Sequence, residues 1–404
     1  MARRVYRLPR QDELTKDQRR VLRMPQKGQH LVVGAPGTGK SVVALLRARG
    51  LIDPEKSFFL TFNHVLSHAT KQLFEGELSC NTAMSLLYSL NWALMEGTRY
   101  TYDQDKMPER EPHKPDYAAL AERFKLIDKD YSDYQIIIDE GQDLPQEWYD
   151  CLTILGFEDF FVVADQNQQI TEENSSRSQL QEVLGLGPSE YTELKENFRN
   201  TTAIALFAST FYTDKASPKP DLPDRPTTDV PILFEYSSID QMKEMVLNEY
   251  DRDPSKLIGF IVPTESKRGW YVKTLANDDK KRSNSKPLIS TYFAQQKEGD
   301  VNIDFSYGGI VVLNDKSVKG IEFDTVFIVL DQLKLINNDI ELLKKRMYVM
   351  SSRAREKLFM FKSAIVPSVV DGILPKLGET VTYSFKRDDK VVEIEEEILK
   401  RRSI

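Results

Sequence analysis

The eight residues Gly34-Ala35-Pro36-Gly37-Thr38-Gly39-Lys40-Ser41 decide the expected fold, because they fit the phosphate-binding pattern G-x-x-x-x-G-K-[ST]. An apolar, strand-like run at 30–34 precedes them, and a run with apolar residues at helical spacing follows at 40–49. Glycines let backbone N–H groups approach a phosphate, and the start of the helix adds its positive dipole end. The motif therefore predicts a nucleotide site on a strand–loop–helix unit. The residues expected to bind the phosphates are Gly34, Gly37, Thr38, Gly39 and Lys40, and Ser41 is expected to ligate Mg²⁺.

A second candidate for the same site is the stretch Asp139-Glu140-Gly141-Gln142-Asp143, which follows the strand-like run 134–138. A carboxylate at the carboxyl end of a strand, beside a phosphate-binding loop, is where a further Mg²⁺ contact belongs. We expect Asp139 to supply that contact and Glu140 to orient or deprotonate the attacking water. The alternative is an acidic turn that caps the helix near Pro145.

Short β-rich runs alternate with helical stretches along the whole chain, which predicts an α/β protein with parallel sheets flanked by helices. Five prolines between 213 and 231 interrupt the alternation, so we expect a linker there between domains at 1–212 and 232–404. Small insertions are expected at about 86–133 and 277–305. The charged stretch 386–402 is expected to form a solvated helical tail, and the three tryptophans to lie in the core.

Composition excludes several classes of protein. The 404 residues include 55 Lys+Arg and 62 Asp+Glu, a net charge of −7, so nucleic acid would be bound in a local groove and not by bulk charge. Two cysteines cannot form a disulfide framework, and no apolar segment is long enough for a signal peptide or a membrane span. We therefore expect a cytoplasmic protein without membrane contact. Neither zinc-ligand spacing nor a second carboxylate cluster of a nuclease is present in the sequence.

Further motifs occur in one order over about residues 14–361, and together with the two above they resemble the UvrD/Rep group of superfamily 1 helicases. This resemblance implies two RecA-like domains in compact form, with small insertions only, that hydrolyse ATP at their interface. It implies that Gln18 in Leu14-Thr15-Lys16-Asp17-Gln18 reads adenine and that Gln168 in 164–170 senses the γ-phosphate. It also implies that Arg199 contacts the γ-phosphate and that the ring of Phe198 stacks on adenine. In the second half of the chain, Gly320 and Glu322 would complete the nucleotide pocket, and Arg353 would be the arginine finger.

The same resemblance implies a track for nucleic acid, where cations bind the backbone and aromatic rings stack on bases. The residues implied are Phe62, Asn63, His64 and Thr82 in the first half of the chain and Lys316 and Ser317 in the second. Two alternatives are open: a core role for Phe62, which ends an apolar strand, and a helix-start role for His64.

The function implied is an ATP-dependent translocase or helicase that moves 3′→5′ on single-stranded DNA or on DNA with a single-stranded tail. The short insertions favour a first alternative, an ATP-dependent regulatory or sensor subunit of a DNA repair or defence complex, with a nuclease or other effector protein as partner. The second alternative is a motor directed to RNA, since nothing in the sequence reads a 2′-hydroxyl.

Overall fold

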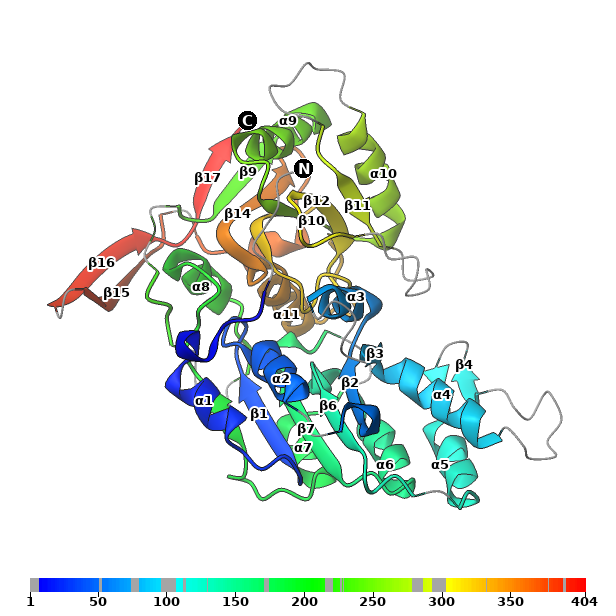
Figure 1. Cartoon of the computed structure of the whole chain (residues 1–404). Coiled ribbons are helices and arrows are strands. Elements are labelled where there is room, and N and C mark those ends of the chain that lie inside the picture. Colours follow the sequence, from blue (N-terminus) through cyan, green and yellow to red (C-terminus); the bar gives the residue numbers. More distant parts are fainter. Residues whose placement is uncertain are drawn as a thin grey trace. The chain divides into compact units, whose positions relative to one another are not determined.

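The structure is a computed structural model of the chain (Figure 1), and it describes residues 7–50, 53–73, 80–95, 107–111, 114–128, 130–170, 174–214, 221–225, 227, 229–277, 286–292, 303–331, 333–376, 378–387 and 390–404. The chain divides into two compact units. The first comprises Leu8–Gly34 and Gly39–Leu194, and the second contains Ala35–Thr38 and Lys195–Ile404. The predicted insertion at 277–305 falls largely on residues outside the described ranges.

The first unit is built on a six-stranded parallel sheet in the order β3-β2-β6-β7-β1-β8. Its strands are β1 (His30–Gly34), β2 (Ser57–Thr61), β3 (Cys80–Thr82), β6 (Gln135–Ile138), β7 (Asp159–Ala164) and β8 (Thr192–Leu194). Strand β7 is buried along its whole length, and three of the four residues of β6 are buried. Continuous apolar strands of this kind are typical of parallel sheets covered on both faces.

Helices cover both faces of this sheet. Helices α1 (Lys16–Leu22) and α2 (Lys40–Arg49) belong to one apolar cluster, in which Val43 packs with Val32 and Phe161. On the other face a larger cluster joins Trp148 of α6 (Gln146–Ile154) and Leu120 of α5 (Tyr117–Lys125) to Ile136 and Val162. Helices α3 (His64–Leu73), α4 (Ala83–Met95) and α7 (Arg177–Val183) complete the unit, and strands β4 (Glu109–Glu111) and β5 (Lys114–Pro115) pair as a small hairpin within the expected insertion at 86–133.

The second unit contains a seven-stranded parallel sheet in the order β11-β12-β10-β13-β14-β9-β17. Its strands are β9 (Ile232–Tyr236), β10 (Leu257–Val262), β11 (Ile289–Thr291), β12 (Gly309–Asn314), β13 (Phe323–Val329), β14 (Ala354–Ser363) and β17 (Lys400–Ser403). Helices α9 (Ile239–Arg252) and α10 (Glu265–Ala276) share an apolar cluster with one face of this sheet. Helices α8 (Thr202–Ser209) and α11 (Ile340–Ser351) contact each other and β14. The predicted α/β class with two parallel, helix-flanked sheets is confirmed.

The expectation of a charged helix at 386–402 is wrong. The chain there forms an antiparallel hairpin, β15 (Thr380–Arg387) with β16 (Lys390–Glu397), and then β17, which adds to the edge of the second sheet beside β9. The physical reason lies in the period: Val392 and Ile394 alternate with Glu393 and Glu395, which is the period of a strand.

The expectation that all three tryptophans lie in the core is correct for one of them. Trp148 is fully buried, whereas Trp92 and Trp270 are 62% and 47% exposed. Trp92 lies on α4 and Trp270 on α10, and both helices turn other residues toward the sheets. Among the helices of the described residues, none combines the length and the apolar character that a membrane crossing requires.

Candidate nucleotide site

The sequence-predicted residues of the first unit gather at one edge of its sheet. Because all strands run parallel, their carboxyl ends meet at the same edge. The phosphate-binding loop leaves β1 after Gly34, Asp139 follows β6, and Asp165 follows β7. Since β7 lies between β6 and β1 in the sheet, Asp165 stands between the other two.

The loop owes its shape to glycines with left-handed backbone conformations. Gly37 has φ 81° and Gly39 has φ 85°, values that side chains with a Cβ rarely adopt. A Cβ on Gly39 would collide with the amide nitrogen of Gln18. The side-chain oxygen of Gln18 accepts the Thr15 N–H at 3.1 Å in a capping box at the start of α1. The structure therefore brings Gln18 to the loop and also gives it a capping role.

Lys40 is 6% exposed and is held at the edge of the sheet. Its Nζ donates to the Gly34 carbonyl at 2.8 Å and lies 3.5 Å from Asp165 Oδ2. A buried ammonium needs such partners, since an unpaired charge in this environment is costly. The Lys40 cation is thus already fixed beside the loop that a phosphate would enter.

Asp139 is 2% exposed and hydrogen-bonds the Ser41 hydroxyl. Burial and the neighbouring Glu140 charge raise the pKa of Asp139 to about 7, although the Ser41 hydroxyl and the Lys40 cation act in the opposite direction. Mg²⁺ is usually bound through one or two carboxylates or hydroxyls together with substrate phosphates and water. The pair of oxygen donors fits that cation. Among the described residues no group of three or more His, Cys, Asp and Glu side chains forms a metal site that could bind a cation without a substrate.

The shifted pKa of Asp139 predicts a pH-dependent cost of folding. In the unfolded chain this carboxyl has its ordinary pKa of about 4. Between pH 4 and pH 7 the folded state therefore holds the proton more tightly, and stability falls as the pH rises through this window. In EDTA and without nucleotide, Asp139→Asn is expected to unfold at a higher temperature than the wild type at pH 8. The expected gain in the free energy of unfolding is a few kcal/mol.

Thermal unfolding followed by circular dichroism at pH 5 and pH 8 measures this difference. It should shrink toward the lower pH. The control is Asp133→Asn, since Asp133 forms an exposed ion pair with Lys56 and is expected to change stability by less than about 1 kcal/mol. An equal or lower unfolding temperature for Asp139→Asn at pH 8 would contradict the predicted cost of burying the ionised Asp139 carboxylate.

Glu140 has φ 60° and ψ 41°, a left-handed conformation that is uncommon outside glycine. The residue is 4% exposed, and its Oε2 accepts from the Gln142 amide at 2.7 Å. Backbone strain of this kind persists where the surrounding structure fixes it, and it is frequent at active sites. The turn therefore points the Glu140 carboxylate in a fixed direction.

The sequence motifs predict no role for Gln142 or Asp165, but the structure places both in the centre of the site. Gln142 is fully buried; its Nε2 donates to Glu140, and its Oε1 accepts the Asp165 N–H at 2.9 Å. Asp165 Oδ2 in turn accepts from Gln168 Nε2 at 2.7 Å. One chain of hydrogen bonds thus joins the predicted base Glu140 to the predicted sensor Gln168. The available signal was that Asp165 directly follows one apolar strand and that Gln142 lies four residues after the end of the adjacent strand.

In the second unit, Arg199 and Glu322 form an ion pair, with Nη2 2.6 Å from Oε1. Burial alone would raise the pKa of Glu322, but the charges of Arg199, Arg355 and Arg353 lower it below its ordinary value. The Arg199 side chain is 12% exposed, and its Nε and Nη1 are buried with no hydrogen-bond partner among the described residues. Two buried, unsatisfied donors on a cation suit an anionic ligand.

Other predicted residues lie around this ion pair. Glu322 and Arg353 directly precede the paired starts of β13 and β14, so they lie at one edge of the second sheet. Arg353 is 1% exposed, and its Nε donates to the Val349 carbonyl at 2.9 Å. Gly320 has φ 78°. Phe198 is 43% exposed, and its N–H donates to the Gly37 carbonyl at 2.9 Å.

The predicted nucleic-acid residues of the first unit lie at the far end of the same sheet edge, because β2 and β3 pair with Thr61 opposite Thr82. Phe62, Asn63 and His64 follow β2. Asn63 Oδ1 accepts the Leu66 N–H at the start of α3, and Thr82 Oγ1 accepts the Ser85 N–H at the start of α4, so both residues also cap helices. In the second unit, Lys316 and Ser317 follow the carboxyl end of β12, at the opposite edge from Glu322.

No protein-family model matches the chain, and no curated protein matches it either. The solved structures that are similar to it include the following two. The C-terminal domain of a possible DNA helicase from Lactobacillus plantarum WCFS1 is 16% identical, with a TM-score of 0.31, over 50% of this chain and 98% of that domain. The PRRSV helicase is 15% identical, with a TM-score of 0.40, over 96% of this chain and 66% of that protein. Both TM-scores are below 0.5, so the strand order and the parallel pairing are what define the α/β fold of this chain.

Proposed function

We propose that this chain is an ATP-hydrolysing motor that acts on nucleic acid, a 3′→5′ translocase or helicase on single-stranded DNA located in the cytoplasm. The observation that carries the proposal is a group of side chains at the carboxyl ends of the first sheet's strands. Its members are Lys40, Ser41, Asp139, Glu140 and Gln168, and hydrogen bonds hold them in place. The motifs over about residues 14–361, which occur in the order found in the UvrD/Rep helicases, support the helicase class. The parallel α/β architecture of both units is compatible with it.

The chemistry follows from these side chains. Lys40 would exchange its Gly34 and Asp165 contacts for the β- and γ-phosphates of ATP, and the glycine loop would donate its N–H groups. Ser41 and Asp139 would hold Mg²⁺, which neutralises charge on the phosphates when bound. Glu140, fixed by Gln142, would take the proton of the attacking water. Gln168 would respond to the γ-phosphate through Asp165.

The arginines of the second unit would complete the catalysis. Charge develops on the γ-phosphoryl oxygens during transfer, and positioned arginines stabilise it. We assign this role to Arg199, whose Nε and Nη1 are available for an anion, and to Arg353. Phe198 and Gln18 would hold the adenine, with Gly320 and Glu322 completing the pocket. Phe62, Asn63, His64, Thr82, Lys316 and Ser317 would contact the strand.

A second candidate is an ATP-dependent regulatory or sensor subunit of a DNA repair or defence complex, in which a nuclease or other effector protein is the partner. The modest insertion at 86–133, with two helices and a two-stranded hairpin among its described residues, favours this candidate, because little is added to the first unit that could separate a duplex.

Steady-state hydrolysis of ATP tests the proposal. The purified chain is assayed alone and with single-stranded DNA of 10 to 60 nucleotides, duplex DNA and single-stranded RNA. A motor on DNA predicts stimulation of about tenfold or more that rises with strand length. Equal stimulation by RNA would support the RNA-directed motor. Tight ATP binding with slow turnover that no nucleic acid changes would contradict the motor and support the regulatory subunit.

A further inference from the structure

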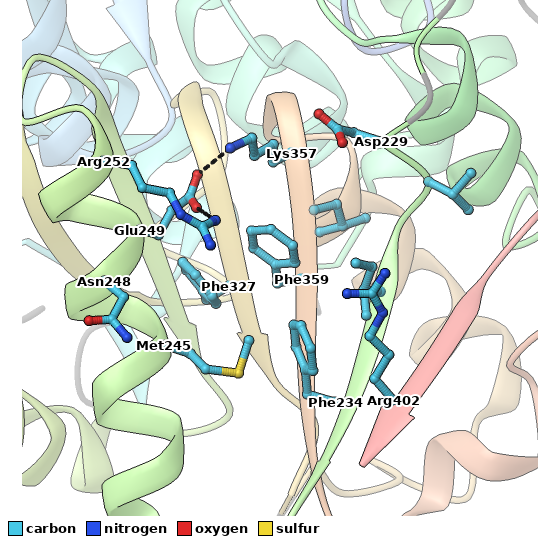
Figure 2. A pocket seen from close by; sticks show the side chains of 13 residues that line it. Asp229, Phe234, Met245, Asn248, Glu249, Arg252, Phe327, Lys357, Phe359 and Arg402 are labelled. Carbon is cyan, nitrogen blue, oxygen red and sulfur yellow. Dashed lines mark hydrogen bonds and ion pairs between the residues drawn. The ribbon is translucent and has the colours of Figure 1, made fainter. Parts of the chain in front are cut away.

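A pocket of about 340 Å³ opens on the second sheet, between helix α9 and the edge strand β17. Figure 2 shows its floor of aromatic rings from three neighbouring strands, with charged side chains above it on both sides. Of the described residues that line it, none belongs to the nucleotide or nucleic-acid motifs. The pocket therefore needs an explanation of its own.

The floor is apolar and ordered by ring contacts. Phe359 of β14 lies between Phe327 of β13 and Phe234 of β9, with ring centroids 4.9 Å and 5.8 Å away. Met245 of α9 forms part of the wall. An aromatic floor with a thioether beside it favours an apolar or aromatic side chain, since rings and sulfur pack well against such a group.

The rim carries an excess of positive charge. Glu249 of α9 is 8% exposed and forms ion pairs with both Lys357 and Arg252 at 2.7 Å. This group of one carboxylate and two cations therefore has a net charge of about +1. Across the floor stands Arg402 of β17, which makes no ion pair with a described carboxylate. Asp229 is the remaining acidic residue of the rim. Three cations against two carboxylates favour an anionic ligand.

The position beside a sheet edge indicates the form of that ligand. Strand β17 is the last strand in the order of the described sheet, and its sequence is Lys400-Arg401-Arg402-Ser403. Basic residues on an edge strand repel a second copy of the same strand. They attract an acidic chain, and an extended peptide can lie along an edge while one side chain enters an adjacent pocket.

We propose that this pocket, lined by Phe234, Phe327 and Phe359 and flanked by Lys357 and Arg402, is a docking site for an acidic peptide segment of a partner protein. One aromatic side chain of the segment lies on the phenylalanine floor. Carboxylates on either side of that residue bind Arg402 and the Lys357–Glu249–Arg252 group. The site is independent of the nucleotide chemistry, because it shares no residue with it.

Methyl NMR of the full chain tests this without ATP. The chain is labelled with ¹³C at the methyl groups of its ten methionines, and Met245 is assigned by the Met245→Leu variant. The probe is the peptide acetyl-Asp-Glu-Asp-Phe-Glu-Asp-amide. Two matched peptides replace its Phe by Ala or its acidic residues by Lys. We expect a saturable shift of the Met245 signal with the probe and binding at least about tenfold weaker with either matched peptide.

Two variants locate the binding. Arg402→Glu is expected to weaken it about tenfold or more, because it reverses a charge of the rim. Arg401→Glu makes the same charge change at the adjacent residue, whose side chain turns to the Pro375 carbonyl, and is expected to weaken binding clearly less than Arg402→Glu does. Unchanged signals of the other methionines show that both variants are folded.

Three results would overturn the proposal: no shift of Met245, equal binding of the Ala or Lys peptide, or equal weakening by the two variants. Phenylacetate is the last probe. If it bound as tightly as the peptide, with the same loss in Arg402→Glu, the pocket would be a site for small aromatic anions and not for a peptide.

Discussion

Lys40→Ala is expected to abolish ATP turnover, with a loss of at least about a hundredfold in kcat/KM. Lys40 is buried, and its ammonium is held by the Gly34 carbonyl and Asp165 at the loop between β1 and α2. A cation fixed in advance costs no reorganisation when charge develops on a phosphoryl group, and removal of one such group commonly lowers the rate by a factor of about 10² to 10³. The variant also removes the ammonium that lies 3.5 Å from Asp165 Oδ2.

The measurement is steady-state hydrolysis with the strand that stimulates the wild type most. Arg49→Ala is the matched control, because Arg49 is an exposed cation on the same helix, α2, at its other end. We expect that control to retain turnover within twofold. If Lys40→Ala hydrolysed ATP at the wild-type rate while folded, the loop would not be the phosphate site.

Much of this site could be predicted because its signals are local. The strand at 30–34 and the helix at 40–49 have the bounds that the sequence pattern indicates, and the loop motif lies between them. The sequence points to Asp139 and Glu140 because these two carboxylates stand at the carboxyl end of the strand 135–138. In parallel α/β proteins such positions meet at one edge of the sheet, because the strands share one direction.

What could not be predicted depends on contacts between distant residues. Gln142 acts through Asp165, 23 residues further along, and no spacing rule connects an amide in one turn with the backbone of another. Strand β17 was expected to be helical because its charged residues were considered without a partner; pairing with β9 makes it a strand. The exposure of Trp92 and Trp270 depends on which helix face meets the sheet, and this too is a tertiary property.

Glu140→Gln is expected to stop hydrolysis while ATP still binds. Glutamine keeps the size of the side chain, and its oxygen can still accept the Gln142 amide that fixes Glu140. It cannot take a proton from water, and loss of a general base commonly costs a factor of about 10² to 10⁴. Binding should change little, because Lys40, the loop and Ser41 remain. The two quantities are measured separately, as single-turnover hydrolysis and as equilibrium binding of a fluorescent ATP analogue.

Comparison of the loss in hydrolysis with the loss in ATP binding shows what Glu140 does. Glu147→Gln serves as the control, since Glu147 is an exposed carboxylate in the first turn of α6 and is expected to leave both values unchanged. Normal hydrolysis by Glu140→Gln would move the base to another residue. Equal losses in binding and hydrolysis would mean that the left-handed turn at Glu140, and not its proton chemistry, is what the site requires. A loss in hydrolysis alone supports the base, because only the transition state uses the proton acceptor.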